Sequence, residues 1–304
     1  MHIRALEWID RFQRYLTTER RVSPHTASAY RLEIAALVAY CDDERIESWD
    51  AVLVPQIRSF AARSHAGGLS PRSVQRRLSA VRTFINFLVR EGIVGGNPAK
   101  VVTAPRVARK LPSVLTAQEM AKLVEIPETD TYSIRDRAIM ELLYSSALRL
   151  IELVRLDCVD IDLRDRVVTV LGKGNKTRLV PVGSFAVAAL QKWLRVRRRF
   201  ADESEKALFV GHGGRRLGPR VVQTRIDQWA RGRGISTHVH PHMFRHACAT
   251  HVLESSGSIR EIQELLGHAS ISTTQIYTHL NAQHLFEAYA KAHPRAHRVK
   301  DRHE

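Results

Sequence analysis

The feature that most constrains the fold of this chain is a stretch of helix-breaking residues about a third of the way along its 304 residues. Glycine and proline, which interrupt regular structure, recur between residues 93 and 112: Gly95, Gly96, Pro98, Pro105 and Pro112. Four basic residues lie in the same stretch: Lys100, Arg106, Arg109 and Lys110. The sequence therefore predicts two domains, residues 1–92 and 113–304, joined by a basic linker over residues 93–112.

Apolar residues at helical spacing predict four helices in the first domain. Two of them begin where a serine that caps a helix precedes a proline that fits its first turn, at Ser23–Pro24 and Ser70–Pro71. The other two are predicted over residues 54–62 and from the spacing of Leu6, Ile9, Phe12 and Leu16. The last helix also carries four arginines, which fit a solvated helix face and a DNA-facing surface equally well: Arg72, Arg76, Arg77 and Arg82.

The second domain combines helices with one β-hairpin. Thr116 and Glu119 have the spacing of a capping box and predict a helix start. Strand-forming residues at 167–171 and 178–182 flank the glycine turn Gly172–Lys176, which predicts the hairpin. Helical patterns cover residues 134–148, 221–230, 244–254, 259–266 and 272–280. The predicted fold class is therefore mainly α and multidomain, a four-helix N-terminal domain plus a mostly helical domain with a small β-sheet.

The charge of the chain indicates a polyanionic partner. Forty-seven Lys and Arg against thirty-one Asp and Glu give a net charge of +16 and a pI near 10.4. A protein this basic usually binds nucleic acid, and a basic surface kept for solubility is the alternative. The linker, extended at about 3.3 Å per residue, spans about 60 Å, which is enough to pass around a DNA duplex. Two domains joined in this way suggest a clamp that closes on DNA.

The cysteines and the N-terminal residues indicate the compartment. Cys41, Cys158 and Cys248 are far apart and form no Cys-x-x-Cys pair, so we expect neither a disulfide framework nor a zinc ribbon. That usage fits a reducing, intracellular environment. The first residues lack the apolar core of a signal peptide, and no window is long and apolar enough for a membrane span. We expect a cytoplasmic protein.

The segment 238–280 holds the residues that chemistry on DNA requires. Cleaving a strand by nucleophilic attack needs a nucleophile, cations that neutralise the transition state at phosphorus, and an acid for the departing 5′ oxygen. His242 and Arg245 are three residues apart, so they share one face of a helix. A Leu-Gly-His motif ends at His268, and Tyr277 follows nine residues later.

Together with an upstream arginine and a lysine in the hairpin turn, this order of residues resembles the signature of the tyrosine recombinase family. The matching positions are Arg149, Lys173, His242, Arg245, His268 and Tyr277. The resemblance covers nearly the whole chain, because the family also has a helical N-terminal DNA-clamping domain, called the core-binding domain, and a linker. Four positions depart from the family's usual residues: Ala147 for Gly, Ile151 for Ser, Phe244 for Leu and Cys248 for Phe.

The resemblance implies a role for each site residue. Tyr277 would attack a backbone phosphate and form a covalent 3′-phosphotyrosyl link, and Lys173 would protonate the leaving 5′ hydroxyl. The scissile phosphate would be held by Arg149 and Arg245. Its oxygens would accept hydrogen bonds from the two histidines, His242 and His268, which could also assist proton transfer. The covalent link conserves the bond energy, so we expect no metal, ATP or other cofactor, and rejoining to a partner strand would pass through a Holliday junction.

Within the family, four segments are closest to the Xer branch: residues 253–257, 263–268, 283–285 and 292–296. This resemblance implies that the chain resolves chromosome dimers at cell division. The implied partners are a double-stranded DNA recombination site, a sister co-recombinase in a heterotetramer on DNA, and a septal DNA translocase as activator. The alternatives are the sister member of the recombinase pair and a plasmid or phage recombinase of the same family.

Several site residues also fit an ordinary structural role. Tyr277 could be a core tyrosine, and Arg149 could form a surface ion pair with Glu152. Lys176 competes with Lys173 as the hairpin lysine. A non-catalytic DNA-binding protein would account for the charge but would leave the tyrosine, the hairpin lysine and the second histidine unexplained.

The alternating histidines His238, His240 and His242 raise a further alternative, a metallonuclease. Against it, Pro241 interrupts any single strand or helix through the group, and the chain has no His-Glu-x-x-His spacing there.

The segment after Tyr277 carries an apolar stripe at helical spacing, formed by Leu280, Leu285, Phe286 and Tyr289. Such a helix either folds back on its own core or docks on a neighbouring subunit, and the family resemblance favours docking. We therefore expect that deletion of residues 282–304 leaves a folded protein that binds one half-site and loses cooperative loading.

Overall fold

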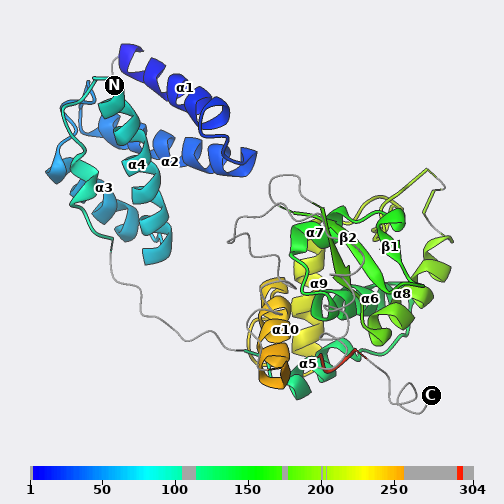
Figure 1. Cartoon of the computed structure of the whole chain (residues 1–304). Helices are drawn as coiled ribbons and strands as arrows, with labels where there is room; N and C mark the ends of the chain where they lie inside the picture. The colour runs from blue at the N-terminus through cyan, green and yellow to red at the C-terminus, as the bar shows by residue number, and fades with distance from the viewer. Residues whose placement is uncertain are drawn as a thin grey trace. The chain divides into compact units, whose positions relative to one another are not determined.

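The protein is described by a computed structural model, which covers residues 3–104, 114–172, 177–199, 201–202, 204–256 and 293–296 (Figure 1). The chain divides into two compact units, residues 1–111 and 112–304. The described residues are mostly helical and include one small antiparallel sheet, which confirms the predicted fold class. In this part of the chain, no helix combines the length and the apolarity that a membrane span requires.

The described residues of the first unit, 3–104, form four α-helices and a short 3-10 helix. They are α1 (Ile3–Thr18), α2 (Pro24–Asp43), α3 (Val54–Ala66), α4 (Pro71–Arg90) and η1 (Pro98–Lys100). The predicted caps are confirmed, since the Ser23 hydroxyl accepts the Thr26 N–H at 3.1 Å and Ser70 accepts the Ser73 N–H at 3.2 Å. Local sequence therefore determines where α2 and α4 begin.

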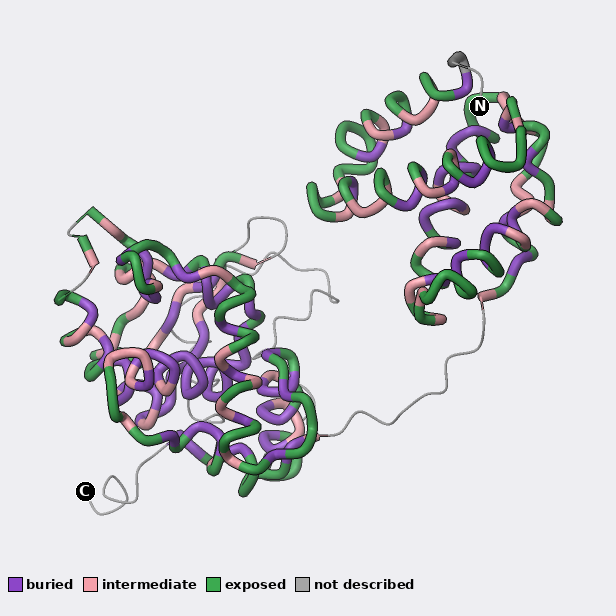
Figure 2. Tube along the Cα trace, turned by 180° about the vertical axis from the view of Figure 1, so that it is seen from behind, coloured by how far each residue is buried: buried purple, intermediate pink, exposed green. Residues whose placement is uncertain are grey.

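Aromatic side chains fill the centre of this unit. The Phe12 and Phe84 rings meet edge to face at 5.1 Å, and Trp49 meets Phe84 at 4.8 Å. The Trp49 indole also donates to the Ala5 carbonyl at 2.7 Å, so its buried N–H is satisfied. Figure 2 shows that the buried residues lie along the inner sides of these helices.

Most of the α4 arginines make contacts inside their own unit. The Glu33 carboxylate, buried on α2, accepts from Arg76 at 2.9 Å and from Arg77 at 2.7 Å. Arg82 donates to the Ala99 carbonyl at 2.9 Å and so ties η1 to α4. Neither the solvated-face nor the DNA-facing interpretation anticipated these contacts, which depend on residues far away in the sequence.

The described residues of the second unit combine helices with a three-stranded antiparallel sheet of order β1-β2-β3. The elements are α5 (Ala117–Val124), α6 (Thr131–Ser145), α7 (Leu150–Arg155), η2 (Cys158–Asp160), β1 (Ile161–Asp162), β2 (Val167–Leu171), β3 (Thr177–Pro181), α8 (Ser184–Arg197), α9 (Pro219–Gly232) and α10 (Pro241–Ser256). The predicted hairpin is confirmed, with Leu171 opposite Thr177. Helix α8 was not predicted, although Leu190 and Trp193 repeat at helical spacing and are fully buried.

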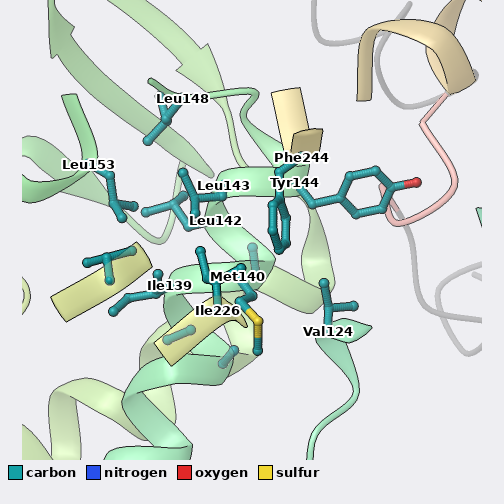
Figure 3. Packing of buried hydrophobic residues seen from close by; sticks show 14 of the residues in the cluster. Val124, Ile139, Met140, Leu142, Leu143, Tyr144, Leu148, Leu153, Ile226 and Phe244 are labelled. Carbon is teal, nitrogen blue, oxygen red and sulfur yellow. The ribbon is translucent and has the colours of Figure 1, made fainter. Parts of the chain in front are cut away.

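Helix α6 is the centre of this unit. It packs against α5, α7, α8, α9 and α10, and every residue from Ala138 to Ser145 is buried. Figure 3 shows its side chains among apolar residues of the neighbouring elements, including Val124, Leu153, Ile226 and Phe244. Helices far apart in sequence therefore meet on one buried helix, and this packing positions the candidate site.

Residues 293–296 lie against the same unit, as the short red segment beside α5 in Figure 1. Arg295 is buried and donates to both oxygens of the buried Glu141 of α6, at 2.9 and 2.5 Å. The Ala296 carbonyl accepts the Ser184 N–H at 3.0 Å, at the start of α8. Residues 293–296 therefore pack on their own unit, whereas the outcome of deleting residues 282–304 stays a prediction. The apolar stripe at 280–289 lies outside the described residues.

Candidate active site

A sharp turn places Arg149 at the start of α7. Helix α6 ends at Ser145, and Ala147 has a φ of +48°, a left-handed conformation that favours glycine. The Arg149 N–H donates to Glu152 Oε2 at 2.9 Å, and its guanidinium donates to Glu152 Oε1 at 2.9 Å. Glu152 therefore holds both the backbone and the side chain of Arg149. The family's usual glycine at position 147 suits this backbone, which Ala147 adopts with some strain.

Arg245 reaches the same turn from α10. Its guanidinium donates to the Ala147 carbonyl at 2.6 Å. Burial, and then the nearby charge of Arg149, lower the pKa of Arg245 to about 10, while Glu152 opposes the shift. The structure thus brings together two arginines that are 96 residues apart in sequence. Two crowded guanidinium groups form a site that favours an anion such as phosphate.

His242 lies in the first turn of α10, three residues before Arg245, and is exposed. Its ring lies 6.2 Å from the His240 ring, edge to face. Burial lowers the pKa of His240, and the charges of His242 and His238 add to that effect. The spacing puts His242 on the Arg245 face of the helix, at an end where backbone N–H groups attract anions.

Sequence reasoning missed Arg178 as a member of this group. Arg178 lies on β3 and donates both terminal nitrogens to Glu152, each at 3.0 Å. The Glu152 side chain is 6% exposed, whereas that of Arg149 is 43% exposed. The predicted Arg149–Glu152 ion pair is therefore present, but its carboxylate is buried. The only sequence signal for Arg178 was its place just after the hairpin turn.

The remaining predicted site residues lie outside the described residues. These are Lys173, its competitor Lys176, His268 and Tyr277. The strands on both sides of the hairpin turn are described, and so is α10, which precedes the segment of His268 and Tyr277. The structure therefore brings Arg149 and Arg245 together and places His242 one helical turn before Arg245 on α10, and the other assignments stay predictions.

The described histidines, cysteines and acidic residues include no group of three or more that could hold a metal ion. His238 instead contacts Asp227, with 2.6 Å between its Nδ1 and Asp227 Oδ1. Within that part of the chain, the alternating histidines give no support to the metallonuclease alternative.

Comparison with known proteins identifies the family. Residues 113–284 match the model of the phage integrase family, and residues 9–92 match the phage integrase N-terminal SAM-like domain. The chain belongs to the phage integrase family. It is a site-specific tyrosine recombinase, an enzyme that cleaves and rejoins DNA strands.

Relatives of similar length support this assignment. The chain is 48% identical over 296 residues to tyrosine recombinase XerC of Xanthomonas campestris pv. campestris, covering 97% of this chain and 91% of that one. It is 50% identical over 291 residues to XerC of Pseudomonas syringae pv. tomato, covering 95% and 97%. The XerC relatives agree with the resemblance to the Xer branch.

Solved structures share the fold. The XerH recombinase bound to palindromic difH, in a post-cleavage complex, matches with a TM-score of 0.73 and 21% identity, over 93% of this chain and 94% of that one. The XerA recombinase matches with a TM-score of 0.50 and 31% identity, over 94% and 98% of the two chains. The first match shows the shared fold alone.

Proposed function

We propose that this chain is the XerC-type recombinase of a pair that resolves chromosome dimers at cell division. The observation that carries the proposal is the meeting of Arg149 and Arg245 at the Ala147 turn, in a chain related to XerC proteins over nearly its full length. The net charge of +16 and the basic linker support binding of duplex DNA between a core-binding domain, residues 1–92, and a catalytic domain, residues 113–304.

The proposed cleavage step forms one bond at phosphorus and breaks another. The Tyr277 hydroxyl gives up its proton to one of the two histidines, His242 or His268, or to water, and its oxygen attacks the scissile phosphate. The bond from phosphorus to the 5′ oxygen breaks, and Lys173 gives that oxygen a proton. The enzyme is left joined to the DNA as a 3′-phosphotyrosyl ester, and the free 5′ hydroxyl leaves.

Arg149 and Arg245 would hold the phosphate and neutralise the charge of its transition state. With a pKa of about 10, Arg245 is protonated at neutral pH. A bound phosphate would relieve the repulsion between the two guanidinium groups, so binding and catalysis draw on the same contact. His242 and His268 would hydrogen-bond the phosphate oxygens or assist proton transfer.

The reverse reaction with a partner strand completes the exchange through a Holliday junction. Because the ester conserves the bond energy, the reaction needs no ATP, metal or other cofactor. We propose a double-stranded recombination site as substrate and an XerD-like co-recombinase in a heterotetramer on DNA. A septal DNA translocase would act as activator. We propose that the protein itself acts in the cytoplasm. These partners are those implied by the resemblance to the Xer branch, and the XerC relatives support placing the chain in that branch.

The decisive experiment traps the protein on a nicked suicide DNA and maps the linked residue. The wild-type protein should form a covalent adduct at Tyr277, whereas Tyr277→Phe should bind the DNA with near-normal affinity and form none. An adduct that persists in the variant, or that maps to Tyr289, would contradict the assignment. DNA binding without any adduct in the wild-type protein would favour a non-catalytic DNA-binding protein.

A further inference from the structure

A buried carboxylate at the edge of the candidate site joins two arginines from different elements. Glu152 Oε1 accepts from Arg149 and Arg178 at 2.9 and 3.0 Å. Glu152 Oε2 accepts from the Arg149 backbone N–H at 2.9 Å and from Arg178 at 3.0 Å. Each carboxylate oxygen therefore has one partner from the start of α7 and one from β3.

Arg178 compensates for the burial of this carboxylate. The Glu152 side chain is 6% exposed, and an unpaired charge at such depth is strongly destabilising. Burial pushes the pKa of Glu152 upward, and the contacts with Arg178, followed by those with Arg149, overcome that effect so that the net pKa is lowered. Arg149 is tied to this carboxylate through two of its own donors, so its position depends on the charge of Glu152.

The arginines around Glu152 differ in how far their side chains are exposed to a ligand. Arg149, Arg178 and Arg245 all act on it, from α7, β3 and α10. Both terminal nitrogens of Arg178 are engaged with the carboxylate, and its side chain is only 12% exposed. Arg149, 43% exposed, is the member of the pair that a phosphate could reach.

We propose that Arg178 is a positioning residue for DNA cleavage, which holds Glu152 ionised and in place so that Glu152 fixes Arg149 against the scissile phosphate. The proposal rests on the proposed role of Arg149. Arg178 also lies opposite Val170 in the hairpin ladder, on the strand that follows the turn of Lys173. The same contact therefore ties β3, the strand that follows the hairpin turn, to the start of α7.

The test is the pH dependence of single-turnover cleavage by Arg178→Gln on suicide DNA. Without Arg178, burial should raise the pKa of Glu152 toward neutrality, and a protonated Glu152 no longer holds Arg149. Cleavage by the variant should approach the wild-type rate at about pH 8 and fall about tenfold for each pH unit below the new pKa. The wild-type rate should show no such loss above about pH 6.

Three variants separate positioning from a general loss of structure. Glu152→Gln combined with Arg178→Gln removes the titrating carboxylate, so its cleavage should be low but free of the new pH dependence. Arg178→Lys keeps the positive charge and loses the two-nitrogen fork, so it should restore most of the wild-type profile. Arg164→Gln, at an exposed turn between β1 and β2, removes the same charge and should match the wild type.

Parallel pH profiles for the wild-type protein and Arg178→Gln would overturn the positioning role, whatever the absolute rates. Failure of the proposed function looks different, because the wild-type protein would then form no adduct at any pH. Melting temperatures of Arg178→Gln measured over the same pH range confirm that the variant is folded in each reaction.

Discussion

The contact between Arg295 and Glu141 allows a quantitative test of how residues 293–296 hold the second unit together. Arg295→Met keeps much of the side-chain volume over the Phe185 ring, which lies 3.9 Å from the guanidinium carbon, but removes the charge. Glu141, 1% exposed, would then be a buried carboxylate without its closest cation. Breaking a buried pair in this way costs about 3–5 kcal/mol.

Proton uptake limits the loss of stability. Burial already raises the pKa of Glu141 against the pull of Arg295, and the variant should raise it further. Protonating a glutamate with an unfolded pKa of about 4.3 costs about 3.7 kcal/mol at pH 7 and about 1 kcal/mol at pH 5. Because the folded state prefers the proton, the carboxylate destabilises it increasingly as pH rises from the unfolded pKa to the folded one. The difference between the variant and the wild type should therefore widen from pH 5 to pH 7.

The assay is thermal unfolding followed by circular dichroism at both pH values. At about 2–4 °C per kcal/mol for a domain of this size, Arg295→Met should lower the Tm by about 10 °C at pH 7 and by much less at pH 5. Combining it with Glu141→Gln should remove most of the pH dependence. A Tm within about 2 °C of the wild type at pH 7 would refute the reasoning, since it would mean that the buried pair adds nothing to the fold.

Three further outcomes are expected. Ala147→Gly should change the unfolding free energy by less than about 1 kcal/mol in urea titrations, because relief of left-handed strain offsets the loss of a buried methyl group. Ala147→Val should sharply reduce both stability and cleavage, because a β-branched side chain disfavours this backbone conformation. Equal behaviour of the two variants would contradict the backbone argument. Strand cleavage should survive excess chelator, and a loss that Zn²⁺ or Mg²⁺ restores would instead favour a metallonuclease. DNA affinity should fall with salt at a log–log slope of about −0.9 per phosphate neutralised, and a flat response in a binding titration would show that the charge of +16 serves another purpose.

The amino-acid sequence by itself determined the local features of this protein. The caps at Ser23, Ser70 and Thr116 are present as predicted, because each joins a side chain to a backbone group three residues away. The hairpin is also local, since its strands are adjacent in sequence. The order and spacing of the site residues were enough to indicate the family, although Lys173, His268 and Tyr277 stay predictions of position and role.

Only the tertiary structure decided which charged residues meet. Arg82 was predicted to face solvent or DNA and instead binds the Ala99 carbonyl. Arg178 had no assigned role and is the main partner of Glu152. Arg295 was placed in a segment whose deletion was predicted to leave the protein folded, and it is buried against α6. Each contact joins residues that are many positions apart, brought together by the packing of whole helices and strands. A buried carboxylate pairs with the arginine that this packing places within hydrogen-bonding distance. The periodicity of apolar residues predicts helices and strands but does not show which arginine that will be.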